Sequence, residues 1–255
     1  MRRGVQASIR LNYMETPVIV YEDNHVLVVI KPANMPSQGD PSGDLDLLTY
    51  LKEMLVKRDN KPGSAYLGLV HRLDRPVSGL VVFAKTSKAA ARLSEQVKSR
   101  EMSRRYLAVV CGVAQESGTL RDYLLKDERS NTTRIVDAGH KNAKEAILNY
   151  RRIGVFEGSD LFSLVEVELI TGRSHQIRIQ MTSVGHPIFG DFKYGHGKPG
   201  QQIALFARKL RFIHPTQKRV LEFSALPRGT PWSLFDVASL LITDSVKDNG
   251  KDTSI

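Results

Sequence analysis

The sequence contains a single cysteine, Cys111, among 255 residues, which excludes an internal disulfide framework and a cysteine-rich zinc site. It also lacks any apolar run approaching the ~18–20 residues that a membrane-spanning helix needs. Arg2 and Arg3 near the N-terminus are not followed by an apolar segment, so we expect no signal peptide. These absences predict a protein of a reducing compartment, and we expect it in the cytoplasm with no membrane partner.

Sequence patterns for cofactors are missing as well. The glycines form no Walker A loop, and no dinucleotide-binding fingerprint follows a predicted strand. His71, His175 and His186 lack the close spacing of a metal-binding helix, and no carboxylate completes a set of ligands. We therefore expect no metal and no other cofactor.

Acidic residues are too few to balance the basic ones. Lys and Arg number 37 against 27 Asp and Glu, giving a net charge of +10 and a sequence pI near 9.7. Such an excess favours a polyanionic partner, nucleic acid above all, because binding to phosphates releases counterions. The alternative is a surface charge that serves solubility alone.

The remaining composition, 41% hydrophobic and 25% charged, is that of an ordinary globular protein. Strands outnumber helices in the hydrophobic pattern and are not regularly separated by them, which favours a mixed, mostly antiparallel sheet of the α/β (α+β) class. We expect helices over Leu45 to Val56 and from Ser87, which would cap the second helix. The expected strands are Val18–Tyr21, Val26–Ile30, Leu80–Phe83, Tyr106–Val110, Ala146–Tyr150, Phe162–Ile170, Leu210–Ile213 and Val220–Phe223.

No linker or repeat divides the chain. We expect one body over residues 18–236, preceded by a basic arm at 1–17 and followed by a C-terminal tail at 237–255. From Asp244 onward the composition is polar, which predicts disorder.

A first candidate cluster, His71 to Leu80, places Asp74 between Arg72 and Arg75 just before a buried strand. Flanking guanidinium groups favour the charged form of a carboxylate, as a nucleophile or base acting on a sugar requires. The alternative is a turn that these ion pairs merely stabilise.

A second cluster runs from Thr171 to Asp191. Its periodicity is ambiguous, because Ile177, Ile179 and Met181 alternate as in a strand, whereas Ile177, Met181 and Val184 fit a helix. We favour a helix that Gly172 and Ser174 open and Gly185 ends, with Arg173 or Arg178 near its start. Backbone N–H groups and guanidinium groups there would bind an anion such as phosphate. A capped surface helix with solvated arginines is the alternative.

Tyr106 follows two arginines, Arg104 and Arg105, and a tyrosine in a basic setting can stack on a nucleic-acid base. It can equally be a tyrosine packed in the core of a sheet.

Taken in order, three blocks resemble the RluA family of RNA pseudouridine synthases. Val26 to Pro36, with Lys31-Pro32, is similar to the first motif of the family, His71 to Leu80 to its catalytic loop, and Thr171 to Asp191 to its third motif. The resemblance implies the pseudouridine synthase fold, in which helices flank a long, mostly antiparallel sheet with a central active-site cleft. It also implies isomerisation of uridine in ribosomal or transfer RNA without a cofactor.

Carried over by position, the resemblance makes Asp74 the catalytic aspartate, Tyr106 the residue that contacts the target base, and Arg178 the partner of the aspartate. Arg72 would fill the RNA helix when the target nucleotide is flipped out. His71, Arg72, Arg75, Arg173 and His175 are the expected substrate-binding residues. Residues 1–17 are too short for the additional RNA-binding domain that many members carry, so target recognition is expected to depend on the catalytic body.

Two rival functions remain open. A noncatalytic RNA-binding or ribosome-assembly factor could share the fold and the charge. A nucleoside or glycoside hydrolase would use Asp74 with a second acid, for which neither cluster supplies an obvious candidate. We expect a monomeric enzyme acting on RNA.

Overall fold

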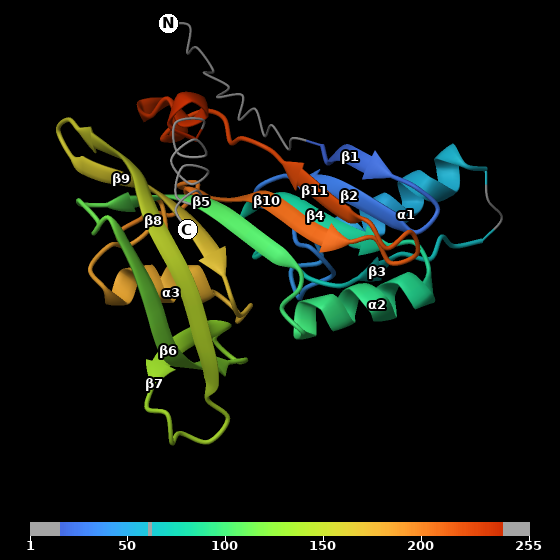
Figure 1. The fold of residues 1–255 in the computed structure, drawn as a ribbon, viewed down its shortest axis with the longest axis horizontal. Helices are drawn as coiled ribbons and strands as arrows, with labels where there is room; N and C mark the ends of the chain where they lie inside the picture. The colour runs from blue at the N-terminus through green and yellow to red at the C-terminus, as the bar shows by residue number, and fades with distance from the viewer. Residues whose placement is uncertain (1–15, 61–62, 242–255) are drawn as a thin grey trace, which may run out of the picture.

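The computed structural model describes residues 16–60 and 63–241, which form a long twisted sheet with helices at its flanks (Figure 1). The sheet has 11 strands in the order β1-β2-β4-β10-β5-β9-β8-β6-β7, with β3 paired to β4 and β11 paired to β10. The strands are β1 (Val18–Glu22), β2 (Val26–Lys31), β3 (Gly68–Leu69), β4 (Ser78–Ala84), β5 (Ser103–Cys111), β6 (Ser117–Asp127), β7 (Thr132–Val136), β8 (Lys144–Glu157), β9 (Leu161–Leu169), β10 (Leu205–Ile213) and β11 (Val220–Ser224).

Among the strands of the described residues, β4 and β10 pair in parallel and the other pairs are antiparallel. This confirms the predicted mixed, mostly antiparallel sheet, and each of the eight expected strands lies within or overlaps an observed one. The turn between β1 and β2 is held by Asp23, whose Oδ1 atom accepts hydrogen bonds from the backbone N–H groups of His25 and Val26.

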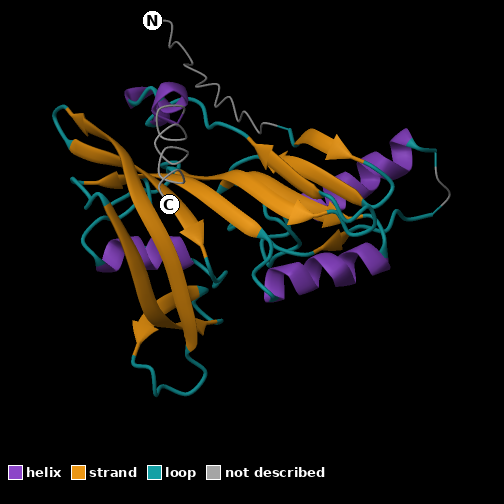
Figure 2. Cartoon of the chain, viewed as in Figure 1, coloured by secondary structure: helices purple, strands orange, loops and turns teal. Residues whose placement is uncertain are grey.

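Helices cover both faces of the N-terminal strands (Figure 2). Strand residues alternate between faces: Leu27 and Val29 pack with α1 (Leu47–Arg58), whereas Val26 and Val28 pack with α2 (Ser87–Lys98). Helix α1 buries leucines four residues apart on one stripe. The cap of α2 is Thr86, not Ser87 as expected, because the Thr86 side chain accepts from the N–H group of Ala89.

A third helix, α3 (Gln176–Ser183), buries Ile177 and Met181 in the same cluster as the α1 leucines. The prediction that Gly185 ends this helix is confirmed, since Gly185 has φ 85° and its N–H group donates to Thr182. The expectation that α3 begins at Gly172 and Ser174 is wrong, because the helix begins at Gln176. The chain reverses at His175 in the left-handed region, with φ 55°, and only then enters the helix.

Gly79 makes the parallel β4–β10 contact sterically possible. Its φ is 123°, and a Cβ atom added there would lie 2.4 Å from the backbone oxygen of Ala207 on β10. A residue with a side chain cannot occupy this position without moving a backbone. This contact brings the segment before β4, which contains Asp74, beside the segment before β10.

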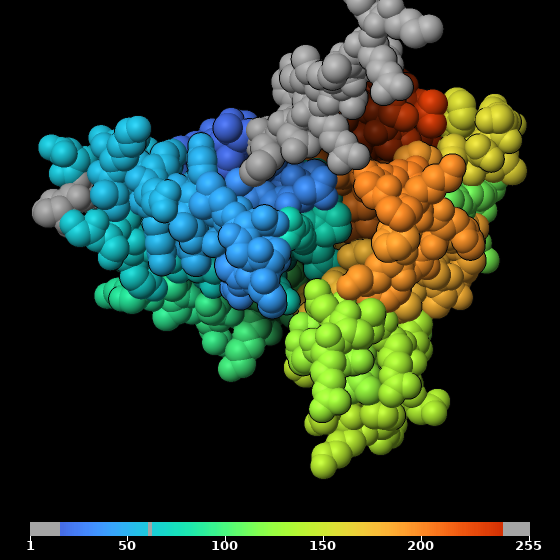
Figure 3. Space-filling model, turned by 180° about the vertical axis from the view of Figure 1, so that it is seen from behind, coloured from blue at the N-terminus to red at the C-terminus, as the bar shows by residue number. Residues whose placement is uncertain are grey.

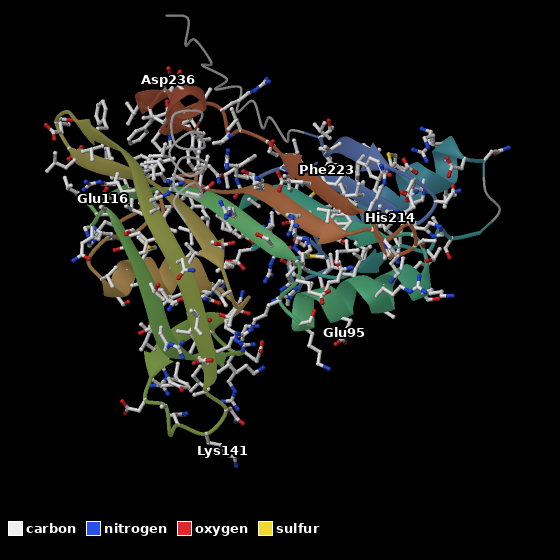
Figure 4. The ribbon with its side chains drawn as sticks, in the orientation of Figure 1. Glu95, Glu116, Lys141, His214, Phe223 and Asp236 are labelled. Atoms are coloured by element: carbon white, nitrogen blue, oxygen red, sulfur yellow. The ribbon has the colours of Figure 1, made fainter. Side chains whose placement is uncertain are left out.

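Strands β6 and β7 were not predicted. With β8 they form an arm that projects from the rest of the sheet, and Lys141 lies in the loop at its far end (Figure 4). In β6 only Leu124 is buried, so the hydrophobic pattern of this segment carries no strand signal; pairing with β8 determines its conformation.

Most of the predicted arm at 1–17 and residues 242–255 of the predicted tail at 237–255 lie outside the described residues. Residues 237–241 are described as helical, and Val237 and Leu241 are buried in the core. Within the part of the chain that is described, no helix is long and apolar enough to cross a membrane.

Candidate active site

Asp74 lies in a tight loop whose backbone is fixed on both sides. The Val77 N–H group donates to the Asp74 carbonyl at 3.0 Å and closes the turn. Before Asp74, the Ser37 hydroxyl donates to the Leu73 carbonyl at 2.7 Å. After it, the Gln202 side chain donates to the Pro76 carbonyl at 2.6 Å. Three segments far apart in sequence therefore position one carboxylate.

Lys31, at the end of β2, provides another anchor. Its ammonium group is fully buried and donates to the carbonyls of Pro32 (2.8 Å), Met35 (2.7 Å) and Arg75 (3.0 Å). Burial lowers the pKa of Lys31 to about 7, while the negative charge of Asp74 acts in the opposite direction. Three acceptors match the three N–H groups of an ammonium, so Lys31 ties the first sequence block to the Asp74 loop.

Two cationic or polar groups face the Asp74 carboxylate. The Arg178 Nη1 atom lies 3.4 Å from Asp74 Oδ2, and the His175 Nε2 atom lies 3.9 Å from the same oxygen. The Asp74 side chain keeps 22% of its surface exposed, against 6% for Arg178 and 7% for His175. Asp74 is thus the one member of the group that a substrate can readily reach.

Arg178 is bound more tightly to a second carboxylate, Asp191. Its Nε and Nη2 atoms donate to the two oxygens of Asp191 at 2.8 and 2.7 Å, in the two-point geometry typical of arginine and carboxylate. Asp191 is fully buried and also accepts from the N–H groups of Lys193 and Tyr194. Arg178 therefore pairs with Asp74 as expected, but Asp191 holds the guanidinium in place.

Tyr194 completes this layer. Its hydroxyl lies 2.6 Å from His175 Nδ1 and accepts from the N–H group of Thr133 at 2.7 Å, and its ring faces the Arg178 guanidinium at 5.1 Å. Burial lowers the pKa of His175, and the Arg178 charge lowers it further, whereas Asp74 acts in the opposite direction. The imidazole beside Asp74 is therefore neutral near pH 7.

Tyr106 on β5 also lines the cleft. It is 5% exposed and lines the same cavity as Asp74 and Arg178. Burial raises the pKa of its hydroxyl, with Arg104 acting in the opposite direction. The hydroxyl of Tyr106 therefore stays protonated at neutral pH.

Two adjoining cavities form a cleft, and both are lined by the same central residues: Arg72, Leu73, Asp74, His175 and Arg178. The smaller cavity extends toward Arg104, Tyr106 and Gly172. The larger one extends between the loop at 36–41 and the segment after β6 at 128–131. Figure 3 shows this face hollowed where the blue, lime and orange parts of the chain meet.

The structure separates the predicted substrate-binding residues into two groups. Arg72, Arg173 and His175 line the cleft, Arg72 exposed on its rim and Arg173 held by the Glu145 carbonyl at 2.8 Å. His71 does not line it. Its ring is buried, Nε2 accepts from the N–H group of Val82, and it belongs to the interior beneath the loop.

Arg75 lines the larger cavity, but its guanidinium is engaged by the loop at 40–44. It donates to the Ser42 hydroxyl at 2.9 Å, contacts Asp44, and lies 3.7 Å from Asp40. The expectation that Arg72 and Arg75 flank the Asp74 carboxylate is wrong. Residues adjacent in an extended turn point in different directions, and the contacts to Asp74 come from α3 instead.

Sequence reasoning assigned no role to Lys31, Asp191 or Tyr194. Asp191 ends the third sequence block. A carboxylate in a block that also contains Arg173 and Arg178 could have indicated that it pairs with one of these arginines. Among the residues described here, no group of three or more His, Cys, Asp or Glu side chains is arranged to hold a metal ion.

Comparison with known proteins identifies the family to which the chain belongs. Residues 25–183 match the family model described as RNA pseudouridylate synthase. The chain is 36% identical over 220 residues to the ribosomal large subunit pseudouridine synthase D of Zymomonas mobilis, covering 81% of this chain and 68% of that protein. It is 34% identical over 199 residues to an uncharacterised RNA pseudouridine synthase of Bacillus subtilis, covering 77% and 64%. The chain therefore spans about two thirds of the length of these relatives.

Among solved structures, human RNA pseudouridylate synthase domain containing 1 superposes with a TM-score of 0.68 at 27% identity, covering 87% of each chain. The expected fold is confirmed by this similarity.

Proposed function

Since the chain belongs to the RNA pseudouridylate synthase family, a family of isomerases, we propose that it converts specific uridines of ribosomal RNA to pseudouridine, with Asp74 as the catalytic carboxylate. One observation carries the assignment of the residue. Asp74 is a partly exposed carboxylate that lines both cavities of the cleft, and the buried Arg178 and His175 face one of its oxygens.

The reaction exchanges one glycosidic bond for another. The N1–C1′ bond of the target uridine breaks, the uracil turns, the C5–C1′ bond forms, and the C5 proton is replaced by one on N1. The Asp74 carboxylate assists the first step either by adding to C1′ or by taking a proton from the sugar. Atoms balance without any redox partner or hydrolytic water, so the proposal needs no cofactor.

The walls of the cleft supply the remaining roles. A base buried in a folded RNA must leave its stack to reach Asp74, and the exposed Arg72 on the rim is placed to take its position. The extruded uracil would stack on Tyr106. Arg178, fixed by Asp191, would keep the carboxylate oriented and charged.

The excess of basic residues supports RNA as the partner. Similarity to a synthase named for the large ribosomal subunit favours ribosomal over transfer RNA. We further propose that the protein acts as a monomer in the cytoplasm.

Pseudouridine mapping tests the proposal. Ribosomal and transfer RNA from cells with and without the gene are compared, and the deletion strain is complemented with the parent or with Asp74→Asn. We expect at least one ribosomal pseudouridine to disappear on deletion and to return only with the parent.

Asp160→Asn serves as the matched control, because Asp160 is an exposed carboxylate in the turn between β8 and β9. It should restore the modification. Loss confined to transfer RNA would refute the substrate, no change in either RNA would refute the activity, and restoration by Asp74→Asn would refute the catalytic residue.

A further inference from the structure

Arg104 enters the cleft from β5, two residues before Tyr106. Alternation along the strand places Arg104 and Tyr106 on one face and Arg105 on the other. Arg104 lines the smaller cavity together with Asp74, Tyr106 and Gly172. Its side chain is half-buried, and its positive charge acts on the pKa of both His71 and Tyr106.

This guanidinium has no partner in the described part of the chain. Its Nε atom is fully buried without a hydrogen bond, and no carboxylate or carbonyl among those residues accepts from the rest of the group. The neighbouring Arg105 differs, since it lies 3.6 Å from both Glu166 and Glu168. A half-buried charge left unpaired is costly, which indicates a position that an anion completes.

Gly172 makes room for this side chain. A Cβ atom added at Gly172 would lie 2.7 Å from Arg104 Nη1 and 3.2 Å from Nη2. The guanidinium therefore rests against bare backbone, and any side chain at Gly172 would displace it. The glycine of the third sequence block thus serves the position of Arg104 and does not open α3.

Within the proposed function, we propose that Arg104 binds a phosphodiester group of the RNA strand next to the target uridine. Phosphodiesters are the anions that RNA brings into a cleft, whereas the carbonyl groups of uracil are neutral and cannot balance a guanidinium charge. The planar fork of arginine matches two phosphate oxygens at once. Arg104 would then fix the backbone of the extruded nucleotide while Tyr106 holds its base.

The experiment measures binding without turnover. A short ribosomal RNA stem-loop centred on the mapped uridine is made with one neutral methylphosphonate at a time in place of each phosphate near that uridine. Its affinity is measured for Asp74→Asn and for the double variant Asp74→Asn/Arg104→Gln. At one linkage the neutral group should weaken binding to Asp74→Asn by roughly tenfold or more, and it should have no further effect on the double variant.

Two matched variants sharpen the result, both in the Asp74→Asn background. Arg105→Gln removes a neighbouring charge outside the cleft and should retain the full methylphosphonate effect. Gly172→Ala leaves the charge unchanged but displaces the guanidinium, so it should lose that effect. The slope of log affinity against log salt should also fall by about 0.7 for Arg104→Gln.

A methylphosphonate effect of equal size with and without Arg104 at every linkage would overturn the proposal, as would an unchanged salt slope. Failure of the proposed function is a separate outcome, because it appears as an unmodified uridine in the mapping experiment. In that case the RNA probe is oligouridylate in place of the stem-loop. The slope of log affinity against log salt, compared with and without Arg104→Gln in the Asp74→Asn background, then tests whether Arg104 binds a phosphate.

Discussion

Arg178 connects two carboxylates with different environments. Asp191 is fully buried and holds Arg178 at two points, whereas Asp74 is partly exposed and meets it at one. This division keeps one carboxylate structural and leaves the other available to substrate. Asp191, whose oxygens already accept from Arg178, Lys193 and Tyr194, is not a replacement for Asp74.

Arg178→Ala should lower both stability and turnover. The buried Asp191 would lose its cation, and breaking a buried pair costs roughly 3–5 kcal/mol of unfolding free energy. Turnover should fall by about 100-fold or more, because Asp74 loses the group that orients it. RNA affinity should change by less than about tenfold, since one contact charge among many is removed.

Urea unfolding, single-turnover kinetics and RNA binding measure these three quantities. Arg178→Lys keeps the charge but not the fork, so it should recover part of the activity. Parental turnover in Arg178→Ala would remove this residue from the site.

His71 predicts a pH dependence of stability. Burial, with a smaller effect of Arg104, lowers the pKa of His71 to about 3, against about 6.5 in an unfolded chain. Between these values the unfolded state binds a proton that the folded state refuses. The contribution of neutral His71 to the free energy of unfolding is therefore fully present above pH 6.5. It falls on acidification by about 1.4 kcal/mol per pH unit.

Unfolding free energies from pH 7 to pH 4.5 test this slope. His71→Gln should reduce the slope of unfolding free energy against pH by about 1.4 kcal/mol per pH unit, the value for one proton. Glutamine does not titrate, and its side chain can still accept a hydrogen bond from the Val82 N–H group. His140→Gln, at an exposed residue, should leave the slope unchanged. An identical slope in His71→Gln and the parent would contradict the buried neutral imidazole.

At the scale of elements, the β4–β10 junction determines the cleft. Asp74 precedes β4, Tyr106 lies on β5, and α3 follows β9, so β10 must pair with both β4 and β5 for the three to meet. The parallel pair is short, and Gly79 permits it.

Gly79→Ala should therefore disrupt the fold more than an ordinary glycine substitution. A positive φ and a backbone clash together cost roughly 3 kcal/mol or more. Gly43→Ala is the matched control, because Gly43 also has positive φ, 73°, but nothing lies within 4 Å of an added Cβ. Its cost should stay near 1 kcal/mol. Thermal unfolding of both variants measures the difference, and equal melting temperatures would contradict the close approach.

The sequence predicted elements well where apolar residues formed a continuous run or a clear helical period. Strands β2 and β4 are buried along nearly their whole length, helix α1 buries leucines on one stripe, and each was expected. Strand β6 was not, because most of its residues remain partly exposed and its conformation depends on β8. The start of α3 was misplaced because the reversal at His175 is not encoded by a glycine.

At the scale of the whole molecule, the site combines residues from across the chain. Asp74 and Arg178 were identified through ordered sequence blocks and Tyr106 through its position between two of them, and the three residues line one cavity. Lys31 and Arg104 were assigned no role in the sequence. The carbonyl groups that bind the Lys31 ammonium come together only in the folded chain. The lack of a hydrogen-bond partner for Arg104 Nε is likewise visible only there. For the same reason His71 was placed in the site although the fold buries it.

The central claim is that the Asp74 carboxylate performs the chemistry, and Asp74→Asn tests it most directly. The substitution is nearly isosteric, and Asp74 has one 3.4 Å contact to Arg178, so melting temperature should change little. RNA affinity at fixed salt should be equal or slightly higher, because a negative charge leaves the cleft in which we propose that RNA phosphates bind. Pseudouridine formation by purified protein on ribosomal RNA should be abolished, since an amide is neither a nucleophile nor a base at neutral pH. A folded Asp74→Asn protein that still converts uridine to pseudouridine would contradict the account.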